Sequence, residues 1–367
     1  MSDHVKRPAP VSKFPELGFY GLPGHTRTPR DLLQQVQDAE ALGVGNVMLS
    51  ERADYKEIAA ICGAAAAVTE NIFIGSSGTN LNTRHPVITA SMGSTLDGLS
   101  DGRFALGLAK GVNLRWQAMG LDFPTFARER EVIDIMRRLW RGEPVLNHSG
   151  ALGEFGAMNL APYVQADVPV LYVGFGPKSL RNAGEIYDGA HLHTFMSDHA
   201  LAESVAAFRD GETAAGRPHN GMLWSVFATA CDVPEEKYLK FIVARLATYL
   251  QIPNYGEMLV KVNNWDMDTL QSFRTHADVK AVGGTIDAVA SLEQIRRIDK
   301  LIPDHWRPAA IGDAKTCAEA WVGQFKAGAD GLIIHASTPD EFAPVLAEYE
   351  KIRPNELFEG RTNRPGA

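Results

Sequence analysis

Short apolar, β-rich runs alternate with longer helix-like segments along almost the whole chain, and this alternation restricts the possible folds more than any other feature. Four phrases repeat one design, a glycine-bearing helix end followed closely by a buried strand: ALGVGNVML, LSDGRFALG, IYDGAHLHTF and AGADGLIIHA. Such tight connections lead from a helix into the next strand of a parallel sheet. The pattern therefore predicts parallel strands covered by helices.

Eight segments have the composition of buried strands. They are residues 17–21, 46–50, 72–77, 103–108, 168–174, 190–195, 222–231 and 331–335. Eight strands alternating with helices over 367 residues fit one α/β fold, a (β/α)₈ TIM barrel. We expect a single barrel domain over residues 1–367.

Residues 237–307 interrupt the alternation, because this segment is helical or irregular and contains no strand-like run. It follows the seventh predicted strand, so we expect a helical insertion at that point of the barrel. Loops after the strands carry the active site in such barrels, which predicts a wall or lid over the mouth. A role of these helices in dimerisation is the alternative.

The charge pattern restricts the possible partners. The formal net charge is −8, and charges of both signs are spread along the chain without a basic stripe for nucleic acid or an anionic membrane. The N-terminus is polar, and no apolar stretch approaches the roughly 18 residues that cross a bilayer. The three cysteines lie far apart, as reduced thiols in a cytoplasmic protein would. We expect a cytoplasmic protein with a small-molecule substrate.

The segment GSSGTNLNTRHP, residues 75–86, begins as a strand and leaves regular structure before a helix opens near Pro86. Its small residues would let a flat ring approach the main chain, and Ser77 and Thr79 offer hydroxyl groups for hydrogen bonds to a ring edge. Taken alone, the segment could equally be an ordinary connection from strand to helix.

The order of such segments resembles the luciferase-like family of flavin and coenzyme F420 oxidoreductases over nearly the full chain. The resemblance rests on GSSGTNLNTRHP, LSDGRFALGLAKG, PVLYVGFGPKSLRNAG and AIGDAKTCAEAWVGQFKAGADGLII. It implies that residues Ser77, Gly78 and Thr79 support the cofactor ring, with a non-prolyl cis peptide between Ser77 and Gly78. It also implies a homodimer.

In GFGPKS, Gly174 and Gly176 flank Phe175, and Pro177 can begin a helix whose first N–H groups face an anion. The resemblance implies that Gly174, Phe175 and Gly176 contact the phosphate-bearing tail of the cofactor. As a dinucleotide fingerprint the segment is incomplete, because serine replaces the last glycine.

The second predicted strand ends in MLSERADY, and the resemblance places Glu51 near the cofactor and the reacting carbon. Relatives that oxidise a sugar phosphate have a histidine after this residue and a glutamate after the fourth strand. Here Arg52 and Val112 occupy those positions, and neither can transfer the required proton at neutral pH. We name Glu51 and Arg52 as catalytic candidates. Arg52 could polarise an anionic or carbonyl-bearing substrate, or form a surface ion pair.

His191 and His193 lie two apart on a predicted strand, so their side chains share one face. Barrel hydrolases use such a pair as metal ligands, but on the first strand and together with ligands from later strands. We expect no metal site, and a metal-dependent barrel hydrolase stays as the more distant alternative.

The sequence thus predicts an F420-dependent oxidoreductase that moves a hydride between the deazaflavin ring and a small organic substrate. An FMN-dependent monooxygenase of the same fold is the alternative, and it would need a more basic site for one terminal phosphate. The scarcity of arginine around GFGPKS favours F420, although Lys178 and Arg181 leave the choice open.

Overall fold

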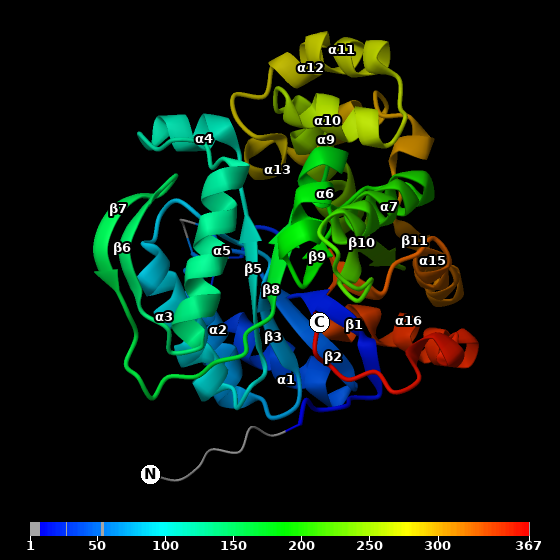
Figure 1. Cartoon of the computed structure of the whole chain (residues 1–367). Coiled ribbons are helices and arrows are strands. Elements are labelled where there is room, and N and C mark those ends of the chain that lie inside the picture. The colour runs from blue at the N-terminus through cyan, green and yellow to red at the C-terminus, as the bar shows by residue number, and fades with distance from the viewer. Residues whose placement is uncertain (1–7, 27, 53–54, 367) are drawn as a thin grey trace.

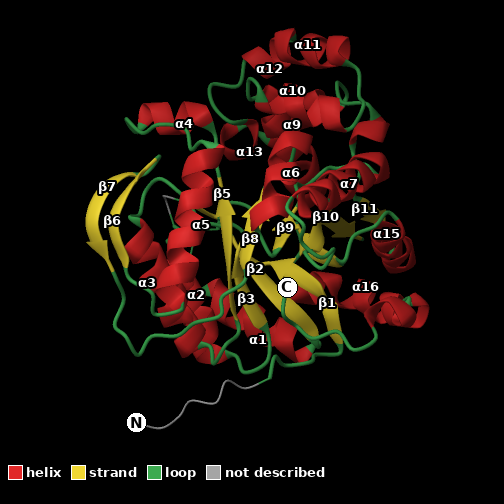
Figure 2. Ribbon diagram, viewed as in Figure 1, coloured by secondary structure: helices red, strands yellow, loops and turns green. Residues whose placement is uncertain are grey.

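The computed structural model describes residues 8–26, 28–52 and 55–366, and within them eight parallel strands close into a barrel (Figures 1 and 2). In ring order the strands are β1 (Phe14–Tyr20), β2 (Val44–Leu49), β3 (Phe73–Ser76), β5 (Phe104–Ala109), β8 (Val170–Val173), β9 (Gly189–His191), β10 (Met222–Cys231) and β12 (Gly331–His335). Pairing of β9 with β10 and of β12 with β1 completes the ring. The predicted TIM barrel is confirmed.

Helices cover the outside of the barrel: α1 (Asp31–Ala41), α2 (Ile58–Val68), α3 (Pro86–Leu99), α5 (Phe126–Trp140), α6 (Pro177–Ile186), α7 (Asp198–Ala214), α15 (Ala314–Lys326) and α16 (Pro339–Ile352). The predicted glycine stop is confirmed at α1. There Gly43 has φ +81° and donates its N–H to the carbonyl of Glu40 at 2.9 Å. Glycine adopts this left-handed conformation without steric cost, so β2 can begin at the next residue.

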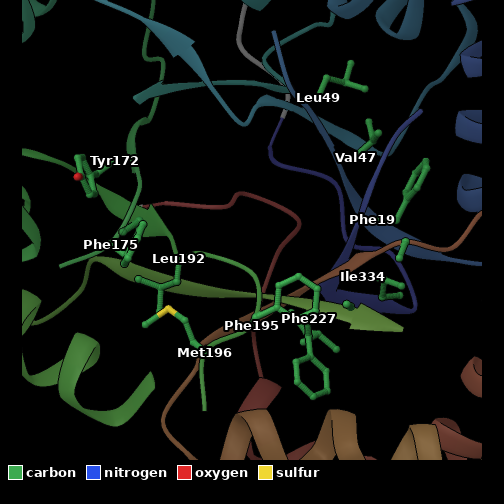
Figure 3. Packing of buried hydrophobic residues seen from close by; sticks show 14 of the residues in the cluster. Phe19, Val47, Leu49, Tyr172, Phe175, Leu192, Phe195, Met196, Phe227 and Ile334 are labelled. Carbon is green, nitrogen blue, oxygen red and sulfur yellow. The ribbon is translucent and has the colours of Figure 1, made fainter. Parts of the chain in front are cut away.

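Outward-facing strand residues pack against the helices. Phe19 of β1 contacts Phe342 of α16 with ring centroids 6.1 Å apart, and Val47 and Ile334 lie in the same layer (Figure 3). A separate cluster of Met48, Trp224, Val226 and Ile333 fills part of the barrel. Alternate residues of one strand therefore serve the two layers, as the pleat requires.

Five predicted strands end earlier than expected. The runs 17–21, 46–50, 72–77 and 168–174 each end one residue early, whereas the run 190–195 stops at His191. In this last run Phe195 has φ +64°, which lies outside the extended region that a strand needs. The residues beyond these strand ends form loops at the barrel mouth instead.

The sequence reasoning missed a two-stranded antiparallel hairpin, β6 (Val145–Gly150) with β7 (Gly153–Met158), between α5 and β8. Most of its residues are exposed, so the hairpin lacks the apolar alternation that marks a half-buried strand. Glu131 of α5 accepts hydrogen bonds at the turn from the N–H groups of Ala151 (2.7 Å) and Leu152 (2.9 Å). Two further short strands were also missed, β4 (Thr79–Asn80) and β11 (Ala310–Gly312).

The helical insertion after the seventh strand is confirmed. Between β10 and β11 lie α8 (Glu235–Tyr238), a π-helical segment (Leu239–Val243), α9 (Ala244–Gln251), α10 (Tyr255–Val262), α11 (Met267–Thr275), α12 (Ala277–Lys280), α13 (Ile286–Val289) and α14 (Leu292–Asp299). Figure 1 shows α9 to α13 beyond the end of the barrel to which the strand arrows point. In the part of the chain that the structure describes, no helix combines the length and apolar character needed to cross a membrane.

Candidate active site

The mouth of the barrel, at the carboxyl ends of the strands, contains three adjoining chambers. The central chamber, of about 400 Å³, extends from Ser77 to the start of α6. The strand-two chamber, of about 610 Å³, lies around Glu51, Arg52 and Gly78. The insertion chamber, of about 510 Å³, lies between the barrel and the insertion, around His25 and Asp287.

Neighbouring chambers share part of their lining. Ala109, Gly111 and Val112 line both the central and the strand-two chambers. Arg245 and His335 line both the central and the insertion chambers. These shared residues can therefore contact a ligand in either of the two chambers that they border.

The segment after β3 forms a bulge, and the predicted cis peptide between Ser77 and Gly78 is confirmed. Tyr20 donates a hydrogen bond from its hydroxyl to the carbonyl of Ser77. A Cβ at Gly78 would lie 2.9 Å from Cγ2 of Val173 and 3.1 Å from the carbonyl oxygen of Gly107. Glycine is therefore required at position 78 by the close approach of β5 and β8 behind the bulge.

Glu51 connects the end of β2 to this bulge. One of its oxygens accepts hydrogen bonds from Oγ1 of Thr79 (2.7 Å) and Nδ2 of Asn80 (3.0 Å). The other lies 2.6 Å from Nη2 of Arg84, whose side chain is only 16% exposed. Arg84 belongs to the segment GSSGTNLNTRHP, but no sequence pattern indicates its pairing with Glu51. Both oxygens of Glu51 are thus engaged by residues that follow the bulge.

Arg52 lines the strand-two chamber, with Nη1 3.4 Å from Nδ1 of His25. Lys110, in the loop after β5, lines the central chamber, and its Nζ lies 3.9 Å from the ring centroid of Phe126. Burial lowers the pKa of the Lys110 ammonium below its usual value. Val112, at the position of the missing glutamate, adds only apolar surface to the cleft.

The start of α6, within the segment GFGPKS, borders the central chamber. Gly174, Phe175 and Ser179 line it, whereas Gly176 is the N-cap residue with φ +97° and Pro177 follows at the first helical position. Because glycine has no side chain, Gly176 cannot itself cap the helix. First-turn N–H groups of α6 are therefore available to an anion, which the positive end of the helix dipole also attracts.

An aromatic wall, formed by Phe175, His193, Tyr249 and Tyr255, closes the central chamber toward the insertion. The hydroxyl of Tyr255 lies 2.6 Å from Nε2 of His193. The ring centroids of Phe175 and His193 are 4.7 Å apart, and those of His193 and Tyr249 are 4.6 Å apart. Tyr249 and Tyr255 were missed; their position in a segment predicted to cover the mouth was the available signal.

Arg245 of α9 and Asp287 of α13 form a buried ion pair with Nη1 and Oδ2 2.7 Å apart. Asp287 also accepts a hydrogen bond from Oγ1 of Thr248 at 3.0 Å, and Nε2 of His25 lies 3.3 Å from its Oδ2. Burial opposes ionisation, yet the positive charge of Arg245 holds the pKa of the Asp287 carboxyl below its usual value. The pair places a fixed guanidinium between the central and insertion chambers.

His191 ends β9, and His193 lies in the loop that follows. In the described residues, no group of three or more His, Cys, Asp or Glu side chains lies where it could hold a metal ion. His191 is 0% exposed, and neither of its ring nitrogens has a hydrogen-bond partner among those residues. Burial lowers its pKa to about 3, so the folded protein holds it neutral.

This buried histidine predicts a pH-dependent stability. In the unfolded chain its pKa returns to the usual 6.5, so its contribution is complete above 6.5 and is lost as pH falls toward about 3. Between about pH 7 and pH 5 we expect the free energy of unfolding to fall in the wild type. In His191→Gln this fall should be smaller by about 2 kcal/mol. Denaturant unfolding at both pH values measures this. The control His199→Gln, at an exposed position, should show the same change in free energy of unfolding between the two pH values as the wild type. The same change in His191→Gln as in the wild type would contradict the prediction.

Known proteins match the chain at the level of the whole barrel. The family model of luciferase-like monooxygenases matches residues 17–331. A Mycobacterium tuberculosis protein named as a coenzyme F420-dependent oxidoreductase is 32% identical over 359 residues, which cover 90% of this chain and 97% of that protein.

Other curated relatives match over a shorter region. The F420-dependent glucose-6-phosphate dehydrogenase of Beutenbergia cavernae is 36% identical over 201 residues, covering 48% of this chain and 59% of that protein. The 5,10-methylenetetrahydromethanopterin reductase of Methanolobus tindarius is 33% identical over 156 residues, covering 42% and 47%. These two matches span about half the length of the relatives.

Solved structures share the fold. The F420-dependent tetrahydromethanopterin reductase of Methanopyrus kandleri has a TM-score of 0.75 at 21% identity, covering 94% of this chain and 99% of that one. The FMN-bound oxygenating constituent of 3,6-diketocamphane monooxygenase from Pseudomonas putida has a TM-score of 0.59 at 20% identity, covering 96% and 98%. Together with the match of the family model over most of the barrel, these findings show that the chain is an enzyme of the luciferase-like monooxygenase family, a family of oxidoreductases.

Proposed function

We propose that this protein binds coenzyme F420 in the central chamber and uses it to transfer a hydride to or from a small organic substrate. One observation carries the proposal. A single chamber of about 400 Å³ extends from Ser77 of the bulge to Gly174, Phe175 and Ser179 at the start of α6. A bulge of small residues allows a flat ring to approach the main chain, and a helix N-terminus attracts an anionic tail. The F420-dependent names of several relatives support the same cofactor.

The residues of the chain fit this group. The main chain at Ser77, Gly78 and Thr79 supports the ring, and Gly174, Phe175 and the first turn of α6 hold the tail. Buried polar atoms without a partner among the described residues, Nδ1 of His193 and Nδ1 of His335, belong to side chains that line the same chamber. When bound, the deazaflavin supplies the site that accepts or donates the hydride.

Glu51 and Arg52 take different parts in this proposal. The hydrogen bonds of Glu51 with Thr79 and Asn80 fix the bulge relative to β2. Arg52 lines the adjoining strand-two chamber, and its guanidinium can orient a substrate that carries oxygen. Because Arg52 and Val112 replace the residues expected for sugar-phosphate oxidation, the reaction proposed here has a different substrate.

Residues 237–307 serve as a lid in the same proposal. Arg245, Tyr249, Tyr255 and Met258 of this segment line the central chamber, so part of its wall exists only while the insertion covers the barrel. A lid of this kind excludes water from the place of hydride transfer.

Calorimetric titration with F420 and with FMN tests the proposed function. We expect F420 to bind more tightly than FMN by at least about tenfold, or about 1.4 kcal/mol. Tighter binding of FMN would replace the proposal with an FMN-dependent monooxygenase. Stoichiometric zinc in the purified protein, without affinity for either cofactor, would instead support a barrel hydrolase.

A further inference from the structure

His335 ends β12 and lies between two chambers. It lines both the central chamber, which contains Ser77, and the insertion chamber, which contains Asp287. Its ring packs edge-on against the ring of Tyr20 with centroids 5.0 Å apart, and Tyr20 donates its hydroxyl hydrogen bond to the carbonyl of Ser77. One aromatic ring thus separates His335 from the bulge proposed to support the cofactor.

The imidazole of His335 has an unused hydrogen-bonding position. Its Nδ1 is buried and has no hydrogen-bond partner among the described residues, although the side chain belongs to the wall of the cleft. A buried polar atom without a partner costs about 1–3 kcal/mol, so such an atom in a cavity wall indicates a ligand that completes it.

The other histidines of the barrel differ from His335. His193 also has a free Nδ1, but its second nitrogen is engaged by the hydroxyl of Tyr255 at 2.6 Å. His191 lines none of the three chambers. Among these three histidines, only His335 borders both the central chamber and the insertion chamber.

The groups that face His335 are mainly cationic. They are Tyr20 of β1, Arg52 and Lys56 after β2, His193 after β9, and Arg245 of α9. Burial, and then these positive charges, lower the pKa of His335 well below its usual value, so it is neutral at neutral pH. The same cations would stabilise negative charge on an oxygen beside the ring.

The insertion chamber indicates the kind of molecule that carries this oxygen. Its wall combines two kinds of side chain: the apolar Phe241, Ala288, Ala290 and Ile295, and the polar or charged His25, Lys240 and Arg245–Asp287 pair. An apolar alcohol, or the corresponding ketone, would place its carbon skeleton against the apolar side chains and its oxygen toward His335.

We propose that His335 is a catalytic residue whose neutral ring donates a hydrogen bond to the oxygen of an apolar alcohol or ketone bound where the central and insertion chambers meet. In reduction of the ketone, hydride from the reduced deazaflavin forms the new C–H bond, and the π electron pair of the C=O bond moves to the oxygen. The ring N–H stabilises the resulting alkoxide until water supplies its proton, and oxidation of the alcohol reverses each transfer. This inference rests on the proposed function.

The test uses the F420-loaded protein with cyclohexanol and cyclohexanone as probes. We expect His335→Gln to lower the turnover rate by about 10²- to 10³-fold, while the affinity of the variant for F420 stays within about threefold of wild type. His199→Gln, which changes an exposed histidine of α7, should keep the wild-type rate. In nitrogen NMR spectra of the loaded wild type, the ring signals of His335, identified by their absence in His335→Gln, should shift when cyclohexanol is added.

The contrary outcomes distinguish failure of the proposed function from failure of this inference alone. Failure of the wild type to bind F420 overturns the proposed function and this inference together. Binding of F420 with no turnover of either probe, with full turnover in His335→Gln, or with unmoved His335 signals overturns this inference alone. If His335→Gln does not fold, through-bond assignment of the wild-type spectrum identifies the same ring signals, so the NMR measurement still decides the question.

Discussion

Gly78→Ala is expected to weaken F420 binding by about 10- to 100-fold and to lower the free energy of unfolding by about 1–3 kcal/mol. The added Cβ would lie 2.9 Å from Cγ2 of Val173 and 3.1 Å from the carbonyl oxygen of Gly107. Both neighbours belong to barrel strands, and the carbonyl cannot retreat as a flexible side chain would. The bulge must therefore move into the central chamber, where the ring is proposed to lie.

Calorimetry with F420 and denaturant unfolding measure the two effects. Gly98→Ala is the matched control, because a Cβ at this position in α3 would have no neighbour within 4 Å outside its own helix in the part of the chain that the structure describes. Alanine favours a helix over glycine, so this control should keep the affinity and gain about 0.5–1 kcal/mol. Wild-type affinity in Gly78→Ala would show that the cofactor does not depend on the bulge.

Arg353→Met is expected to lower the free energy of unfolding by about 3–5 kcal/mol without changing the F420 affinity of the folded protein. Arg353 donates hydrogen bonds of 2.7 Å from Nε and from Nη2 to the carboxylate of Glu16, which is 0% exposed. Tyr349 donates a third at 2.9 Å. Removing Arg353 leaves the buried Glu16 carboxylate without its counter-charge. Glu16 lies four residues along β1 from Tyr20, which is at the mouth of the barrel.

The double variant Glu16→Gln with Arg353→Met distinguishes two effects of Arg353→Met: the loss of the ion pair with Glu16 and the loss of packing by the Arg353 side chain. It should recover much of the lost stability, because no unpaired charge stays in the barrel. Chemical unfolding of the two variants gives the comparison. A loss below about 1 kcal/mol in Arg353→Met would mean that the Glu16 carboxylate finds water or another partner.

The elements that could be predicted from the sequence are those whose structure is locally determined. Gly43 must follow α1 because the next residue already begins β2, and the eight apolar runs are long enough to identify each barrel strand. The hairpin β6–β7 could not be found, because its exposed residues carry no apolar alternation and Glu131 stabilises it from another element.

The candidate site was predictable only where one short segment forms it. The bulge at Ser77 and the α6 start at Gly174 each lie within a few consecutive residues, and both line the central chamber. Pairs that join distant elements were missed. Arg84 meets Glu51 across 33 positions and Arg245 meets Asp287 across 42, and only the closed barrel and its insertion bring these charges together.

Hydrogen exchange of the backbone amides, measured with and without F420, tests the central claim most directly, because it reports where the cofactor lies. We predict slower exchange in two separate segments, residues 75–80 of the bulge and 174–180 at the start of α6. The β6–β7 hairpin, which borders none of the three chambers, should exchange as before. Binding of F420 that leaves both segments unprotected would contradict the proposed cofactor site.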